Sequence, residues 1–423
     1  MPQSSVKGSW QSLLDIGTPR PEWACAACLN DEFIKQLCTP NAKELRCCGC
    51  GSREGLGAPI EKIAERIRSP LQQHYELDIG LYPGYELSLP QIIRLAIGCE
   101  HAVVVEAVAS LLEDEEPDEE SGESAAEESF YYPGQCYSRI RSPFDSEDHE
   151  RWYVVGDWYH VAHDLVHGHR FFNDEARALF SRLLSEAMAA TAPESPDSSA
   201  VLRILPEGSF IYRSRVSKDE DQTRLFKEQP GKQLGAAPRS IAANSRMSVA
   251  GVPVFYGSAE LETCIAEVRP SIGDTVVAGQ FHTTRPLKLF DFTRLDYRLR
   301  HEPLSLLDPM HEQRNMDRTL LSYLHEEIAK PIRSNDTGYV VTQALTEFIR
   351  YGRQEKFDGV AFQSVQHRNG LNYALFDEDD PSAPQFLDGR LLFPVDILTE
   401  RVTEHVVDSL DYVLSPFEPA SAT

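Results

Sequence analysis

The sequence predicts an α+β protein in which a helical N-terminal half precedes a mixed α/β C-terminal half. Three observations support this fold class. Apolar residues recur at three- and four-residue steps over much of residues 53–190, as in amphipathic helices. Short β-rich runs alternate with helical patterns over residues 201–400. Between them, residues 191–200 read TAPESPDSSA, a Pro- and Ser-rich stretch that predicts a linker.

The helices of the N-terminal half can be placed from their apolar positions and caps. We expect them after Pro59, over residues 92–112, over residues 152–167 and over residues 174–188. Ser88 and Gln91 have the spacing of a capping box ahead of the second of these. Because each has an apolar face to bury, we expect a helical bundle.

The elements of the C-terminal half are shorter and alternate in type. Strands are predicted over residues 211–212, 252–257, 275–281, 287–292, 359–363 and 371–376. Helices are predicted over residues 261–268, 318–329 and 339–354. The alternation predicts one mixed domain, followed by a tail at 401–423.

The composition limits the partners. Lys and Arg total 41 against 66 Asp and Glu, a net charge of −25 that would repel a phosphate backbone. Ten of the acidic residues lie in residues 113–129, which we expect to be a solvated loop. Residues 1–20 read as a lead-in without a signal-peptide pattern, and no apolar run approaches about 18 residues. We expect a cytoplasmic protein that binds neither membrane nor DNA directly.

Two C-x-x-C pairs lie in a short N-terminal module, residues 21–52. They are Cys25 with Cys28 and Cys47 with Cys50, separated by 18 residues, as in a four-cysteine zinc ribbon. Four thiolates close the zinc coordination shell, so the metal would be structural. Cys38 and Cys48 lie in the same module and complicate the choice of ligands. The alternative is a set of incidental free thiols.

A second candidate metal motif, His163-Asp164-Leu165-Val166-His167, has the spacing of the zinc peptidase motif H-E-x-x-H. Asp replaces Glu and is one methylene shorter, and no third ligand is evident in the sequence. We interpret these histidines as ordinary residues on a helix.

The C-terminal half carries several motifs in a fixed order. They are Ile211-Tyr212-Arg213, residues 244–248 (NSRMS), 251–256 (GVPVFY), 261–270 (LETCIAEVRP), 359–364 (GVAFQS) and 369–376 (NGLNYALF). In order and approximate spacing they resemble the RES family, named for its Arg, Glu and Ser. The resemblance covers about residues 205–395, within the expected domain 201–400.

The N-terminal half shows a second resemblance. The paired C-x-x-C motifs, the helical stretch, and residues 158–170 ahead of Phe171-Phe172 look like the module, distantly akin to HEPN domains, that some longer RES proteins carry. The resemblance implies a HEPN-like helical module over residues 53–190.

The RES resemblance implies a fold like that of ADP-ribosyltransferases and a reaction that consumes NAD. Breaking the nicotinamide–ribose bond builds positive charge on the sugar, and a nearby carboxylate stabilises it. Glu267 is the candidate for this role. Nicotinamide leaves as a neutral molecule, so no acid is needed to protonate it. No G-x-G-x-x-G or P-loop motif occurs in the sequence, so we expect NAD to be a substrate and not a recycled cofactor.

The other candidate residues suit the remaining parts of NAD. Its pyrophosphate is best bound by a planar, permanently charged donor such as arginine. Arg213 is the first candidate and Arg246 is the second. Tyr256 can stack on the nicotinamide ring or bond through its hydroxyl. Ser364 and Asn372 can donate to ribose or amide oxygens. The alternative for Tyr256 and Asn372 is a packing or turn role.

The predicted function is therefore cleavage of NAD by hydrolysis or phosphorolysis, in a toxin or defence effector. One alternative is an ADP-ribosyltransferase that modifies a macromolecule; another is a noncatalytic interaction protein that senses NAD. Short RES toxins are typically paired with an antitoxin, so a helix-turn-helix partner is expected. Because a further module is fused here, control by the chain's own N-terminal module is the other option.

Overall fold

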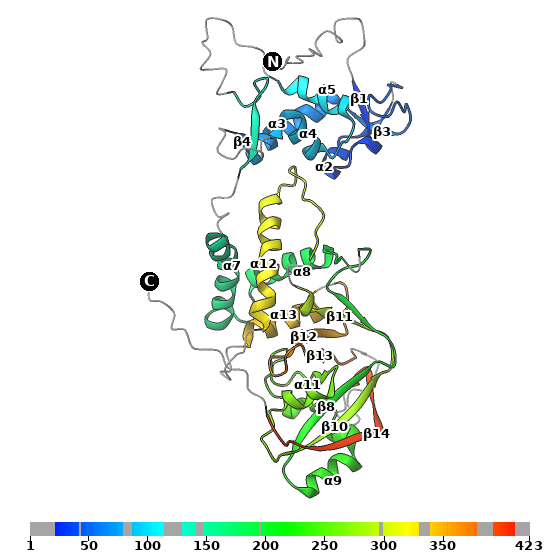
Figure 1. The fold of residues 1–423 in the computed structure, drawn as a ribbon, viewed down its shortest axis with the longest axis vertical. Helices are drawn as coiled ribbons and strands as arrows, with labels where there is room; N and C mark the ends of the chain where they lie inside the picture. Colours follow the sequence, from blue (N-terminus) through cyan, green and yellow to red (C-terminus); the bar gives the residue numbers. More distant parts are fainter. Residues whose placement is uncertain are drawn as a thin grey trace, which may run out of the picture. The chain divides into compact units, whose positions relative to one another are not determined.

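The computed structural model describes residues 22–41, 44–78, 87–113, 129–140, 147–193, 196–295, 299–329, 339–352, 354–378 and 392–410. The expected lead-in, all but the ends of the acidic loop, and residues 411–423 of the expected tail lie outside these ranges. The chain divides into two compact units (Figure 1). Unit 1 comprises Met1–His149 and Pro303–Gln313, and unit 2 comprises Glu150–Glu302 and Arg314–Thr423.

Unit 1 combines small antiparallel sheets with helices. The described strands form one sheet in the order β1-β3-β2 and another in the order β4-β6-β5. The elements are β1 (Trp23–Cys25), η1 (Ala26–Cys28), α2 (Glu32–Lys35), β2 (Thr39–Pro40), β3 (Leu56–Pro59), α3 (Ile60–His74), β4 (Tyr75–Leu77), β5 (Leu87–Ser88), α4 (Leu89–Ile97), α5 (Ala102–Leu112) and β6 (Cys136–Arg139). The apolar faces of α3, α4 and α5 meet in one buried cluster.

The expected single helix over residues 92–112 is wrong. The capping box of Ser88 and Gln91 is present, but α4 ends at Ile97 and α5 starts at Ala102, bent by 114°. Gly98 causes the break, because its φ of 59° is left-handed and its N–H caps the helix. Among the described residues no single helix is long and apolar enough to cross a membrane; α4 and α5 together pass by length and composition only.

Unit 2 is built on a mixed sheet, which among the described residues has eight strands in the order β14-β10-β8-β9-β13-β12-β11-β7. The strands are β7 (Leu202–Leu205), β8 (Phe210–Ser217), β9 (Phe255–Ser258), β10 (Thr275–Thr283), β11 (Leu287–Asp291), β12 (Gly359–Gln363), β13 (Leu371–Leu375) and β14 (Val395–Val406). Neighbours pair antiparallel except β11 with β12, which are parallel. The fold class of mixed helices and sheet is therefore confirmed in its broad form.

Helices of unit 2 cover this sheet (Figure 1). They are α7 (Glu147–His167), α8 (Asp174–Ala189), α9 (Glu220–Glu228), α10 (Pro230–Gln233), η2 (Arg239–Ile241), α11 (Leu261–Glu267), η3 (Phe292–Arg294), α12 (His311–Ala329) and α13 (Val340–Tyr351). The first three residues of α7 and of α12 belong to unit 1. One buried cluster joins α7, α8, α12 and α13 to β11, β12 and β13, and a second joins β8, β9, β10 and β13 to α9 and the residue after α10.

The division differs from the expected module boundaries at two places. We expected α7 and α8 to belong to a helical bundle with α3 to α5, but they fall in unit 2. The reason is packing: Leu183 of α8 is buried with Phe290 of β11 and Ile349 of α13. The expected start of the tail at residue 401 falls inside β14, which pairs with β10 as far as Val406.

The stretch expected to be a linker, residues 191–200, also lies in unit 2. Ala192 and Ala200 are buried, and Thr191 pairs with Arg300 through two backbone hydrogen bonds of 2.8 Å. The Pro- and Ser-rich composition therefore marks an ordered connection at its described residues.

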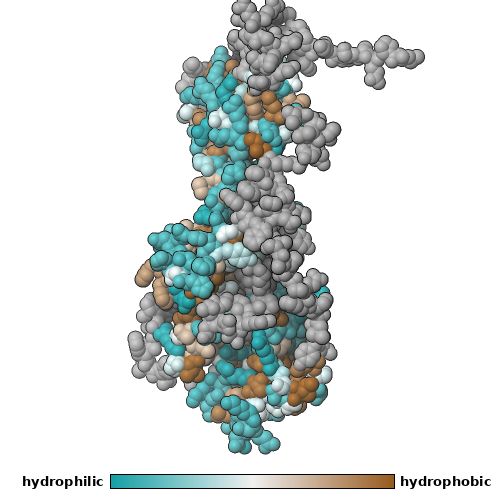
Figure 2. Space-filling model, turned by 90° about the vertical axis from the view of Figure 1, so that its left-hand side faces the viewer, coloured by the Kyte–Doolittle hydropathy of each residue, from teal (hydrophilic) through white to brown (hydrophobic). Residues whose placement is uncertain are grey.

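On the face seen in Figure 2, hydrophobic surface occurs as separate patches among hydrophilic residues.

A buried ion network connects α8 to α12. Glu186 accepts from Arg314 Nε at 2.5 Å and from Arg318 Nε at 2.7 Å. Burial raises the pKa of Glu186, but hydrogen bonds from the two arginines lower it more, so the pKa lies below its usual value. The network therefore contributes stability only while the carboxylate is charged.

We expect Glu186→Ala to destabilise unit 2 by about 3–5 kcal/mol, because it removes the buried carboxylate that compensates the charges of two arginines. Denaturant unfolding measures this, with the exposed Glu228→Ala of α9 as the control within about 0.5 kcal/mol. Since the folded pKa is lowered, the stabilisation is fully present above the unfolded value of about 4.3. It decreases below that value and is lost once the pH falls through the lower folded pKa. Equal stability of the two variants would contradict this role.

Candidate active site

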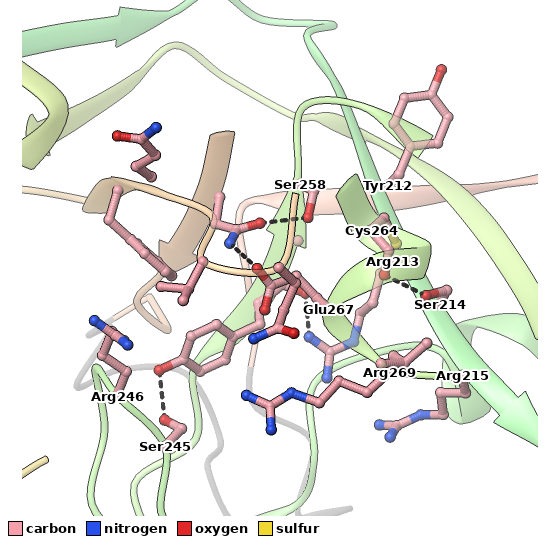
Figure 3. Close-up of a pocket in the computed structure, with 18 of the residues that line it drawn as sticks. Tyr212, Arg213, Ser214, Arg215, Ser245, Arg246, Ser258, Cys264, Glu267 and Arg269 are labelled. Carbon is pink, nitrogen blue, oxygen red and sulfur yellow. Dashed lines mark hydrogen bonds between the residues drawn. The ribbon is translucent and has the colours of Figure 1, made fainter. Parts of the chain in front are cut away.

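A cavity of about 430 Å³ opens in unit 2 beside the middle of the sheet. Its walls come from β8, β9, β12, β13, α11 and the turn at residues 244–246 (Figure 3). Five of the six predicted site residues line it: Arg213, Arg246, Tyr256, Glu267 and Asn372. The sixth, Ser364, reaches the same place by hydrogen bonding to Glu267.

Glu267 is the last residue of α11 and is held from two sides. Its Oε1 accepts from Ser364 Oγ at 2.6 Å and from Asn372 Nδ2 at 2.7 Å. Asn372 is buried, and its Oδ1 accepts from Ser258 Oγ at 2.7 Å, which fixes the direction of the amide. No hydrogen bond to the other oxygen, Oε2, is found within the described part of the chain. The carboxylate is thus oriented, with one oxygen left to face the cavity.

Arg213 of β8 also lines the cavity. Its Nη1 donates to the backbone oxygen of Tyr256, while its buried Nε has no partner among the residues described. Burial lowers the pKa of Arg213 to about 10, so the guanidinium is still charged at neutral pH. No carboxylate pairs with it in the described ranges. Such a cation has unused donor capacity for an anion.

Tyr256 uses its hydroxyl inside the protein. The hydroxyl accepts from Met247 N at 2.8 Å and lies 2.5 Å from Ser245 Oγ. Burial raises the pKa of Tyr256 to about 12, so it stays protonated. Because the hydroxyl is already bonded to the protein, the ring is better placed than the hydroxyl to contact a ligand.

Helix α13 holds the turn that carries Arg246. Gln343 Nε2 donates to Ser245 O at 2.7 Å, and Thr342 Oγ1 donates to Arg246 O at 2.8 Å. Burial lowers the pKa of Arg246. In Figure 3 this arginine lies on the other side of Glu267 from Arg215 and Arg269. The cavity therefore has basic groups on both sides of its carboxylate.

Arg215, Arg269 and Ser258 also line the cavity, and the sequence analysis did not name them. Strand periodicity points to Arg215, which lies two residues after Arg213 on β8. Its Nε donates to Gln233 O at 2.7 Å. Arg269 follows Glu267 closely but has a left-handed φ of 49°, which no local pattern reveals. Ser258 pairs in register with Asn372, a relation that only the sheet pairing shows.

The four predicted cysteines come together in unit 1. The sulfurs of Cys25, Cys28, Cys47 and Cys50 lie within 4.8 Å of one another, and Cys25 Sγ is 3.6 Å from Cys28 Sγ. Zinc–sulfur bonds of about 2.3 Å at tetrahedral angles would place sulfurs roughly 3.8 Å apart. This group can hold a metal ion.

The thiols of the group differ in acidity, because burial raises the pKa of Cys25 and of Cys28 whereas the pKa of Cys47 is lowered. Burial acts to raise the pKa of Cys47, but backbone N–H groups of Cys25, Cys50 and Gly49 lower it to about 7. Cys25 N lies 3.3 Å from Cys47 Sγ. Cys38 and Cys48, which complicated the choice of ligands, are outside the group.

The histidine pattern on α7 forms no comparable site. The rings of His163 and His167 lie 4.9 Å apart, and both residues are exposed. Asp164 between them accepts from Asn173 Nδ2 at 2.7 Å. Across the described ranges no third ligand joins this pair. The interpretation as ordinary helix histidines fits this arrangement.

This α+β domain thus contains a cavity lined by arginines and by one oriented carboxylate. Such a cavity resembles an enzyme site for an anionic ligand. Residues 210–395 match the family model described as RES domain, less than half of the chain. This match supports a RES domain protein, and such a domain is consistent with an NAD-related toxin family. No curated protein matches the chain, and no solved structure does.

Protein purified without chelator or added metal should contain about one zinc per chain. Replacement of an exposed ligand in Cys50→Ser should remove most of that metal and lower the melting temperature, because bound metal stabilises only the folded form. Elemental analysis and thermal unfolding measure both effects. Cys136→Ser changes an exposed cysteine outside the group and serves as the control. Folded wild-type protein without metal would contradict the assignment.

Proposed function

We propose that this chain is an NAD-consuming enzyme that cleaves the bond between nicotinamide and ribose. One observation carries the proposal. The same cavity contains an oriented carboxylate, Glu267, and an arginine, Arg213, that has no acidic partner in the described ranges. A dinucleotide with an anionic pyrophosphate, and with a ribose that gains positive charge as nicotinamide leaves, suits both groups. The RES match supports NAD as the substrate.

Glu267 would act on the sugar. As the bond to nicotinamide lengthens, positive charge grows on the ribose, and the carboxylate stabilises that charge. Ser364 and Asn372 bind Oε1, so Oε2 is the oxygen to face the ribose. Because both donors are fixed, the carboxylate needs little reorganisation when the charge develops.

Arg213 would bind the pyrophosphate, with Arg246 as a second contact. An anion in the cavity would satisfy the partnerless Nε of Arg213, whose burial without a partner is otherwise unfavourable. Tyr256 lines the cavity and its hydroxyl bonds within the protein, so its ring is the part that would pack against nicotinamide. We assign hydrolysis or phosphorolysis as the reaction.

We further propose that the four-cysteine group holds structural zinc and that the enzyme acts in the cytoplasm on the NAD pool. Depletion of NAD would make it a toxin or defence effector. Its control would come from a helix-turn-helix partner or from unit 1 of the same chain.

The direct test incubates purified full-length protein with NAD and follows free nicotinamide, with water alone, with phosphate, and with a protein or RNA acceptor. Release in water or phosphate supports the proposal. Label from NAD that appears on the macromolecule would identify a transferase in its place. Absence of nicotinamide under all three conditions would overturn it.

Glu267→Gln should slow turnover roughly 100-fold or more, because it keeps the size of the side chain and removes its charge. NAD binding should change little, since the charge it faces develops only in the transition state. Steady-state kinetics and calorimetry measure the two quantities. Glu262→Gln, an exposed change on the same helix, is the matched control. Near wild-type turnover would remove Glu267 from the mechanism.

Arg213→Lys should raise KM more than it lowers kcat. Lysine keeps the charge but loses the planar donor pair, and the pyrophosphate hardly changes during the reaction. Initial-rate measurements over a range of NAD concentrations separate the two constants, with the exposed Arg224→Lys of α9 as the control. A severe fall in kcat at unchanged KM would mean that Arg213 acts near the breaking bond.

A further inference from the structure

Two histidines and a glutamate meet in unit 1, away from the cysteine group. His74 ends α3, while His311 and Glu312 begin α12. Donor atoms of the three side chains lie within 4.8 Å of one another, and His74 Nδ1 is 3.6 Å from Glu312 Oε1. The two imidazole rings are 4.6 Å apart between centroids. His311 and Glu312 lie within the range of the family match, but the proposed reaction uses none of the three residues.

His311 is held in the orientation that a metal ligand needs. Its Nδ1 lies 2.9 Å from the backbone oxygen of Ser305, and an oxygen of this kind only accepts, so Nδ1 carries the proton. The lone pair is therefore on Nε2. A backbone carbonyl on the opposite ring nitrogen is the usual support of a metal-binding histidine. His311 is 5 % exposed, so its ring cannot rotate freely.

His74 is held by packing, since its ring lies against the ring of His311. Its side chain is mostly buried, and only Glu312 of the three is exposed. Two fixed imidazoles and one carboxylate that can close on an ion make an asymmetric but complete set of three ligands. Imidazole nitrogen with carboxylate oxygen is a donor set that suits zinc and related divalent ions.

Arg139 of β6 interacts with the unprotonated ring nitrogen of His311. Its Nη2 lies 3.3 Å from His311 Nε2, and the residue is exposed. A divalent ion would have to displace this guanidinium, which can move into solvent. Arg139 therefore competes with a metal for the same nitrogen and weakens its binding.

We propose that His74, His311 and Glu312 form a second metal site, for a divalent ion of the zinc class, that fastens residues 303–313 to the end of α3. Tetrahedral bonds of about 2.1 Å need donors roughly 3.4 Å apart, close to the distance between His74 and Glu312. The fourth position is left to water. The ion links parts of unit 1 that are separated in sequence by residues 150–302 of unit 2.

The test titrates metal-depleted full-length protein with Co²⁺ and with Zn²⁺. The first equivalent of Co²⁺ should give the thiolate charge-transfer band of the cysteine group. A second, weaker equivalent should bind without that band, and in Zn²⁺ it should raise the melting temperature further. This second equivalent should be lost in His74→Gln and in Glu312→Gln, while the thiolate band remains. Glu312 is exposed, so its replacement does not endanger folding.

Two further variants sharpen the test. Arg139→Gln should tighten the second equivalent roughly tenfold, because it removes a competing cation. His163→Gln with His167→Gln changes an exposed histidine pair on α7 and should leave both equivalents unchanged. A wild-type protein that binds one equivalent only would overturn the proposal. So would a second equivalent that survives both His74→Gln and Glu312→Gln.

Discussion

The hydrogen-bond chain from Ser258 through Asn372 to Glu267 is the constraint on which the candidate active site depends. It runs from β9 to β13 and ends on the last residue of α11, at distances of 2.7 Å for both bonds. The two polar residues inside it are nearly fully buried, so each must have a partner. Ser364 adds a bond from the loop after β12. The position of one carboxylate thus follows from the pairing of strands far apart in sequence.

The same cavity keeps opposite charges from neutralising each other. Arg213 bonds to a backbone oxygen and Glu267 to neutral donors, and within the described ranges neither forms an ion pair. A buried cation without a counterion costs free energy, and the surrounding sheet and helices must supply it. Glu186 elsewhere in unit 2 is paired with two arginines by contrast. Charges that form no ion pair among the described residues are expected where a ligand binds.

Local sequence patterns predicted the elements well where one period dominates. The strand predicted over residues 359–363 coincides with β12, and α11 starts at Leu261 as predicted. Patterns failed where tertiary context decides. The break at Gly98 needs a left-handed residue inside an apolar run, and the partner of the apolar face of α8 cannot be read from that face. An amphipathic helix shows that it buries one side, not which unit buries it.

The site residues divide in the same way. Arg213, Tyr256 and Glu267 lie within short motifs and were found from them, whereas Ser258 gains its role only through the register with Asn372. The sequence around Ser258 carries no local signal for such a pairing, because its partner lies 114 residues away. The cysteine pairs were the strongest local signal, because two tight turns at a suitable spacing already specify four ligands.

The path of the chain connects the two units at more than one place. Residues 303–313 belong to unit 1, yet they lie between two segments of unit 2 and lead directly into α12. Arg314 and Arg318 of that helix bind Glu186, and its apolar residues share a buried cluster with α13. Helix α13 in turn holds the turn at Arg246. The chain itself therefore connects residue 313 to the helix that binds Glu186, and the buried cluster of that helix includes the helix that holds the turn at Arg246.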